Sequence, residues 1–75
     1  MNKYTTFEWV KKVISSVENN SQDIVSEQLI MNFDVMFNDH SLTSKLWSHS
    51  TSHMNKWLKL AEIKNSLHSQ NHKNN

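Results

Sequence analysis

The apolar residues near the start of the chain recur at intervals of three and four. This spacing predicts an amphipathic helix with one apolar stripe. Thr5 and Glu8 have the spacing of a capping box, so we expect the helix to begin at Thr5. Asn19 and Asn20 can end it, because asparagine tolerates the left-handed conformation. The stripe consists of Phe7, Val10, Val13, Ile14 and Val17.

A second helix is predicted to begin after Ser21, which can cap it, and to end near Phe37. The segment from residue 29 to residue 37 is apolar nearly all round, which favours a central position in a bundle. Residues 38–40 are polar and are expected to form a short loop. The predicted inner face of this helix comprises Ile24, Val25, Gln28, Leu29, Asn32, Phe33 and Met36, and it is widened by Ile30, Met31, Val35 and Phe37.

The second half of the chain has one polar interruption, the SHSTS run at residues 48–52. We interpret it as a turn between two short helices, the first capped by Ser41 and the second by a residue of the run itself. One bent helix over residues 41–68 is the alternative. Residues 69–75 hold no apolar residue and are expected to form a disordered polar tail.

These elements predict an all-α fold in a single domain, residues 1–68, built as a small bundle of three to four short helices that can contain a helix-turn-helix. The 75-residue chain has no glycine and no proline, which argues against the tight turns of a sheet-rich fold. It also lacks cysteine, so disulfides and thiolate metal sites are excluded. Because so short a chain buries a marginal core, we expect a homodimer or a partner subunit to support it.

Charge is divided unevenly between the two halves. Residues 1–39 hold three lysines against six acidic residues, a net charge of −3, whereas residues 40–75 hold five lysines against Glu62 alone, a net charge of +4. A basic half can attract nucleic acid or an acidic protein. No apolar run approaches the ~20 residues of a membrane span, and no signal peptide is recognised. We therefore expect a cytoplasmic protein, in the host cell if a phage encodes it.

The basic half carries a recognisable pattern around the serine run. The segment Thr43–Lys45 has the character of a helix start with Ser44 as its small residue, and Trp47 and Trp57 take core positions on either side of the turn. The second helix would contain Ser52, Met54, Asn55, Lys56 and Leu58. Residues 41–59 thus resemble the helix-turn-helix of phage repressors of the lambda Cro type. The chain departs from them at Ser48, where glycine is usual, and at His49, where an apolar residue is usual.

The resemblance implies a small DNA-binding transcriptional regulator of phage or mobile-element type that binds double-stranded DNA. In such a protein the second helix enters the major groove, where asparagine and serine can read base edges. Lysines would contact phosphate and make binding salt-dependent. All eight basic residues are lysine, and the absence of arginine removes the commonest contact to guanine. The residues expected to contact DNA are Lys45, Ser50, Thr51, Ser52, His53, Asn55, Lys56 and Lys59.

The aromatic content supports a rival hypothesis. Four short helices cannot bury all the large aromatic and methionine side chains of this chain, so some are expected in an interface, where such residues are enriched. The alternative function is a small helical phage-type protein that binds and inhibits a host or rival protein, such as an antirepressor or an inhibitor of a polymerase or a defence system. The expected interface residues are Trp9, Phe37, Trp47 and Trp57.

Catalysis and metal binding find little support in the sequence. His49 and His53, like His68 and His72, are four residues apart and share a helix face, but no cysteine or adjacent glutamate completes a zinc site. No nucleophile elbow or glycine-rich oxyanion loop is present. We expect a protein that is not an enzyme and that uses no cofactor or metal.

Overall fold

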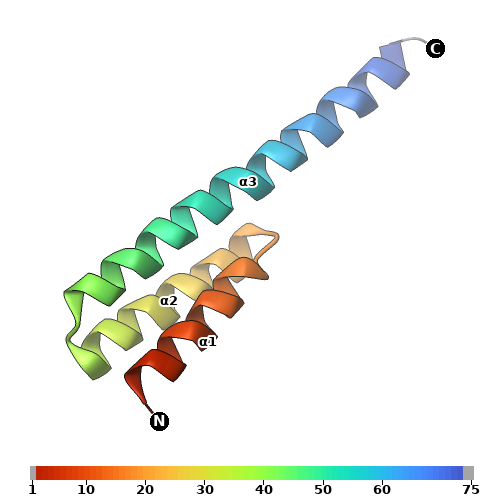
Figure 1. Ribbon diagram of the computed structural model, residues 1–75. Coiled ribbons are helices and arrows are strands. Elements are labelled where there is room, and N and C mark those ends of the chain that lie inside the picture. The colour runs from red at the N-terminus through yellow and green to blue at the C-terminus, as the bar shows by residue number, and fades with distance from the viewer. Residues whose placement is uncertain (1, 74–75) are drawn as a thin grey trace.

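The computed structural model describes the backbone of residues 2–73 and the side chains of residues 2–65. Over that range the chain forms three helices and no strand (Figure 1). They are α1 (Lys3–Ser15), α2 (Asn20–Phe37) and α3 (His40–Lys73). The predicted all-α bundle is therefore confirmed. No helix within residues 2–73 is both long and apolar enough to cross a membrane.

Helix α1 begins earlier than the capping box predicts. The side chain of Asn2 is the N-cap, and its Oδ1 accepts a hydrogen bond from the backbone N–H of Tyr4 at 2.7 Å. Thr5 lies inside the first turn of the helix rather than at its cap. Asparagine and threonine both satisfy free N–H groups at a helix start, and capping by Asn2 adds most of a turn to α1. The helix also ends earlier than predicted, at Ser15.

Helix α2 starts and ends at asparagines. The side chain of Asn19 accepts a hydrogen bond from the N–H of Gln22 at 2.9 Å, so the N-cap lies two residues before the predicted Ser21. Asn38 ends the helix in the left-handed conformation, with φ of 50°, and its N–H donates to the carbonyl of Asp34 at 2.8 Å. The predicted end of this helix is confirmed, and asparagine replaces the glycine usual at such a position.

Residues 40–73 form one unbroken helix, which corrects the predicted turn at residues 48–52. A helix-turn-helix within residues 41–59 is therefore not confirmed. Serine and threonine cost only a few tenths of a kcal/mol each inside a helix, and neither glycine nor proline is present to break it. The helix start is capped by Asp39, whose Oδ1 accepts from the N–H of Leu42 at 3.1 Å. Nor does the predicted boundary at residue 68 coincide with a helix end.

The core lies where the three helices meet. The apolar stripe predicted for α1 is buried in the core at Val10, Ile14 and Val17, with Phe7 packed at its edge. Phe33 of α2 is at the centre, and its ring lies 6.2 Å from that of Phe7 and 4.9 Å from that of Phe37. Tilted ring pairs of this kind add to the stabilisation from burial alone. Helix α3 contributes Leu42 and Leu46.

The structure also corrects the predicted inner face of α2. The buried residues are Ser26, Ile30 and Phe33, whereas Ile24 and Val25 are exposed, as is Met36. Phe33, which was predicted on the inner face, is buried, and the ring of Phe37 packs against it. Ser26 occupies little space between the helices, and its hydroxyl is satisfied by donating to the carbonyl of Asp23 at 2.8 Å.

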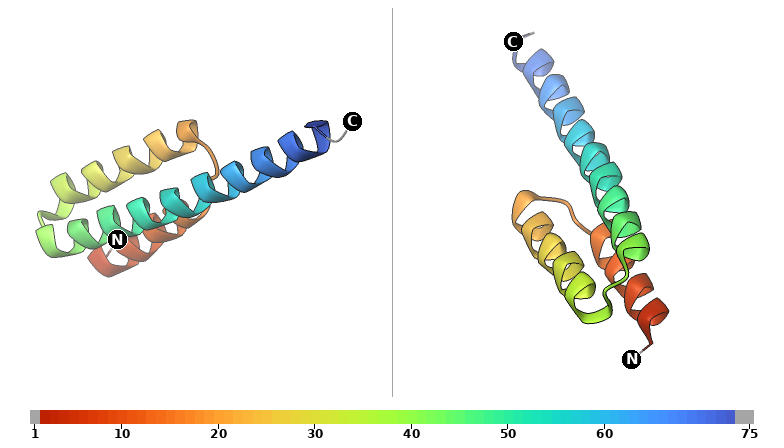
Figure 2. Two further views of the ribbon diagram at one scale, coloured as in Figure 1. Left: turned by 90° about the horizontal axis from the view of Figure 1, so that it is seen from above. Right: turned by 90° about the vertical axis from the view of Figure 1, so that its left-hand side faces the viewer.

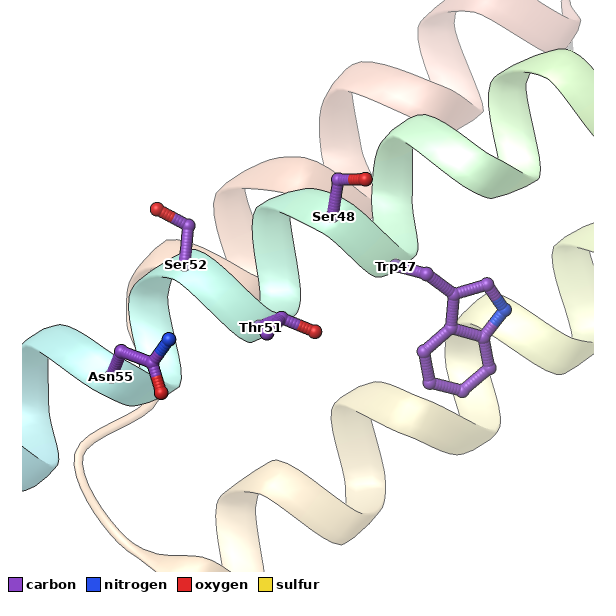
Figure 3. A pocket seen from close by; sticks show the side chains of 5 residues that line it. All are labelled: Trp47, Ser48, Thr51, Ser52 and Asn55. Carbon is purple, nitrogen blue, oxygen red and sulfur yellow. The ribbon is translucent and has the colours of Figure 1, made fainter.

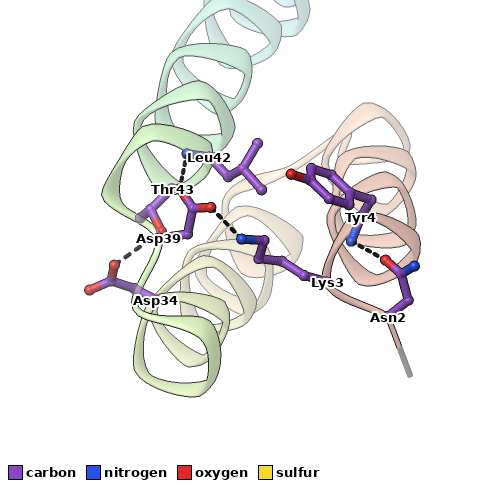
Figure 4. Close-up of polar contacts among 7 residues, drawn as sticks. All are labelled: Asn2, Lys3, Tyr4, Asp34, Asp39, Leu42 and Thr43. Carbon is purple, nitrogen blue, oxygen red and sulfur yellow. Dashed lines mark hydrogen bonds and ion pairs between the residues drawn. The ribbon is translucent and has the colours of Figure 1, made fainter.

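Polar contacts fasten one end of the bundle (Figure 4). The ammonium of Lys3 lies 2.8 Å from Oδ2 of Asp39, which joins α1 to the loop between α2 and α3. The hydrogen bond from Lys3 is the main cause that holds the pKa of the Asp39 carboxyl below its ordinary value. Thr43, which is buried, donates to Oδ1 of Asp34 at 3.0 Å and ties α3 to α2.

At the other end, α3 leaves the bundle. A helix of 34 residues is about 50 Å long, whereas α2, with 18 residues, spans about 27 Å. Figures 1 and 2 show the second half of α3 extending past the loop between α1 and α2 with no helix beside it. The molecule is accordingly elongated, 56 × 18 × 16 Å.

Candidate protein-binding surfaces

The residues predicted to contact DNA do not share one surface. Ser50 is buried, and His53 is half-buried with its Nε2 donating to the carbonyl of Val17 at 2.6 Å. Both therefore face α1 and the loop that follows it. The other six predicted residues are exposed on the remaining sides of α3: Lys45, Thr51, Ser52, Asn55, Lys56 and Lys59.

Thr51, Ser52 and Asn55 line a shallow depression together with Trp47 and Ser48 (Figure 3). The Trp47 ring projects sideways toward α2, while the short polar side chains point away from the bundle. The depression is open and has no charged group in its lining. The serine run therefore lies on a continuous helix, with most of its side chains exposed to solvent, and does not form the predicted turn.

The two histidines around the serine run hold α3 against α1. Nε2 of His49 lies 2.8 Å from Oγ of Ser15. That hydroxyl donates its hydrogen to the carbonyl of Lys11 at 3.0 Å, so it accepts from the His49 ring. Burial lowers the pKa of His49, and the nearby positive charge of Lys11 adds to the shift. Within the described part of the chain, no three metal-binding side chains converge on one point.

The residues predicted to form an interface have different environments. Trp9 is 53% exposed on α1, and Trp47 is partly exposed on α3. Phe37 instead packs against Phe33 and belongs to the edge of the core. Trp57 is half-buried where α3 leaves the bundle. The two most exposed of the four predicted aromatic residues, Trp9 and Trp47, retain the most surface that a partner could cover.

The largest apolar surface lies on α2, on the side opposite its buried residues. We call this surface the α2 outer face. Its five apolar side chains are between 51% and 83% exposed, and Val35 is the most exposed of them. Its two polar members are amides, and none of its seven residues is ionisable. The α2 outer face consists of Ile24, Val25, Gln28, Met31, Asn32, Val35 and Met36.

A second surface lies at the point where α3 leaves the bundle. Glu18, from the loop after α1, faces Trp57, Leu60, Ala61 and Lys64 of α3 across a groove, which we call the Trp57 groove. The Nε1–H of Trp57 is buried but has no hydrogen-bond partner among the described residues. Leu60 is 61% exposed. The groove therefore offers apolar surface and one charge of each sign.

These two surfaces were missed by sequence reasoning for different reasons. The residues of the α2 outer face have apolar side chains or amides, and their spacing also fits an inner face, so pattern alone does not separate the two. The Trp57 groove pairs Glu18 with residues about forty positions later, and only the parallel packing of α1 and α3 brings them together. The sequence contained one indication that the α2 outer face is an interaction surface, namely that none of its residues carries a charge.

Comparison of the chain with protein-family models, with curated proteins and with solved structures found no match.

Proposed function

We propose that this chain is a small helical protein that binds another protein, and that it binds through the Trp57 groove. The observation that carries the proposal is the extension of α3 beyond the bundle with apolar residues uncovered. Protein binding of this kind is the function of small helical inhibitors and antirepressors, which act by covering a surface of their target.

The extension continues the face by which α3 packs on the bundle. Leu46, Ser50 and Trp57 lie on that face, and Leu60, Ala61 and Lys64 follow it at intervals of three and four. Inside the bundle the face is covered by α1 and α2, whereas Leu60 is largely exposed to water. A helix receives most of its stability from tertiary packing on such a face. A partner that covers Leu60 would therefore stabilise the extension as well as bind to it.

The polar groups of the Trp57 groove favour a peptide partner. Glu18 and Lys64 lie at the groove and could each pair with an opposite charge on the partner. An amphipathic helix that lies along α3, with its apolar face on Leu60, meets these requirements.

The test is capture of a partner from an extract of the cells in which the gene resides, with and without nuclease. The full chain serves as bait beside two variants. Leu60→Glu places a charge in the groove, and Asn55→Glu places the same charge on the outward side of α3 as a matched control. Both residues are exposed, so neither change should unfold the bundle. We expect one nuclease-resistant partner that the wild type and Asn55→Glu retain and that Leu60→Glu loses at least tenfold.

Failure to capture any partner, or equal capture by Leu60→Glu, would contradict the proposal. A partner that disappears on nuclease treatment would favour nucleic acid instead.

DNA binding remains a second hypothesis, but it now rests on exposed lysines of α3 and no longer on a helix-turn-helix. Lys45 and Lys56 are about three turns apart and lie on one exposed side of α3, so both could contact phosphates of one duplex. Without paired helices, this arrangement would bind duplexes of any sequence alike. Fluorescence anisotropy of a labelled duplex tests it. Binding at low salt that weakens for Lys45→Ala and Lys56→Ala would support the hypothesis, and no binding at low salt would refute it.

A further inference from the structure

The α2 outer face has a composition that water-exposed helices seldom show. Ile24, Met31 and Val35 follow one line along the helix, and Val25 and Met36 lie beside it. All five are more than half exposed. Charged residues usually make up about a quarter to a third of a soluble surface, whereas this face has none. An apolar patch of this kind marks an interaction surface.

We propose that a second copy of this chain covers the α2 outer face, with the two α2 helices packed antiparallel about a two-fold axis. A two-fold interface is made of the same patch on both copies, so charges of one sign on the patch would be buried opposite charges of the same sign. Buried like charges would oppose association. The absence of ionisable groups makes the α2 outer face compatible with itself.

The order of residues along the face suits an antiparallel pair. If the axis crosses the outer face at the level of residue 30 along the helix, Gln28 lies opposite Asn32 of the partner subunit, and Val25 lies opposite the partner's Val35. The two amides can then exchange hydrogen bonds, which satisfies the polar groups of the face. Each helix end also meets the end of opposite dipole sign. The flexible side chains of Met31 and Met36 can fill gaps between the two helices.

The area of the face sets the strength expected of the dimer. The exposed parts of its five apolar residues amount to on the order of 500 Å². Stable interfaces bury about 800 Å² on each partner. The α2 outer face alone falls short of that value, so we expect a reversible dimer whose population changes with concentration in the micromolar range.

The test is sedimentation equilibrium of the full chain from micromolar to submillimolar concentration. We expect the apparent mass to rise from the monomer's 8.9 kDa toward twice that value. Val35→Lys places a charge at the most exposed position of the face and should weaken association at least tenfold. Because that side chain is 83% exposed, the helical circular dichroism of the variant should equal that of the wild type. The matched control, Ser48→Lys, adds the same charge on exposed α3 and should associate like the wild type.

This inference goes beyond the proposed function and fails separately from it. Leu60→Glu should dimerise like the wild type, because the Trp57 groove lies on another surface. A strict monomer at the highest concentration would overturn the dimer proposal. So would Val35→Lys associating as tightly as the wild type, or Leu60→Glu abolishing the dimer while Val35→Lys keeps it.

Discussion

Helices α1 and α2 border the same core but differ in what they present to water. The exposed side of α1 carries the charged residues Glu8, Lys11 and Lys12, and the exposed rings of Tyr4 and Trp9 lie among them. The outward side of α2 carries apolar side chains and two amides. Since both helices are already packed on their inner faces, the core does not require the apolar residues outside α2. We infer that α2 has a second, uncharged surface to cover, whereas the exposed aromatic rings of α1 lie among charged side chains.

The largest expected effect comes from the two faces of α2 itself. Phe33 is 1% exposed and contacts two other phenylalanines, so Phe33→Ala should cost about 3–5 kcal/mol and unfold much of this small domain. Val35→Ala, two residues away on the outer face, should change the stability of the monomer by less than about 0.5 kcal/mol. Urea denaturation at low protein concentration measures both. A similar loss for the two variants would show that the outer face is packed within the monomer.

A smaller effect should separate the buried and exposed sides of α3. Thr43 is buried and donates to Asp34, so Thr43→Val should lower the free energy of unfolding by about 1 kcal/mol. Thr51→Val makes the same change on the outward side, where the hydroxyl is exposed, and should be nearly neutral. Thermal unfolding followed by circular dichroism compares them. Equal effects would contradict the packing of α3 on α2 described here.

The start of α1 permits a comparison of similar size. Asn2→Ala removes the observed cap and should cost about 1 kcal/mol, while Thr5→Ala should have little effect because Thr5 is inside the helix. The same denaturation experiment distinguishes them. Should Thr5→Ala be the more damaging change, the capping box predicted from sequence would be the true start of the helix.

The smallest expected effect is the pH dependence of the contact between α1 and α3. The pKa of His49 is lowered in the fold, chiefly by burial, so protonation favours the unfolded chain. Its contribution to stability is therefore complete above about pH 6.5, the unfolded value, and is lost as the pH falls through the folded value. Unfolding midpoints at several pH values should show this loss in the wild type and less of it in His49→Gln. An identical pH profile for the two proteins would contradict the assignment.

How far the sequence predicted the fold differs from helix to helix. The core of α1 was predicted correctly because its apolar residues form a single stripe, which leaves one choice of inner face. On α2, apolar residues surround the helix, and the choice between Ile24 and Ile30 as a core residue depends on where Phe33 meets Phe7 and Phe37. This packing contact joins α2 to Phe7 of α1, which is distant in the sequence, so the local spacing of apolar residues cannot reveal it.

The serine run shows the limit of local signals for helix ends. Serine and threonine favour caps, and the sequence therefore permitted a break at residues 48–52. In the structure, Ser50 is buried on the side of α3 that packs on the bundle. His49 bonds to Ser15 at the end of α1, and His53 bonds to Val17 in the loop that follows. These contacts, made with residues more than thirty positions away, favour a continuous helix. The residues predicted to contact DNA were chosen on the assumption of a turn. On the continuous helix they lie on two different sides of α3.

The contrast between α1 and α2 can be tested most directly by cross-linking, because the chain contains no cysteine and single cysteines can be placed at will. Gln28→Cys lies at the middle of the α2 outer face, and Thr5→Cys lies on the exposed side of α1. With a short bis-maleimide at about 100 µM protein, we predict a covalent dimer for Gln28→Cys and little or none for Thr5→Cys. Equal cross-linking at both positions, or none at Gln28→Cys, would contradict the assignment of α2 as the surface that a second copy covers.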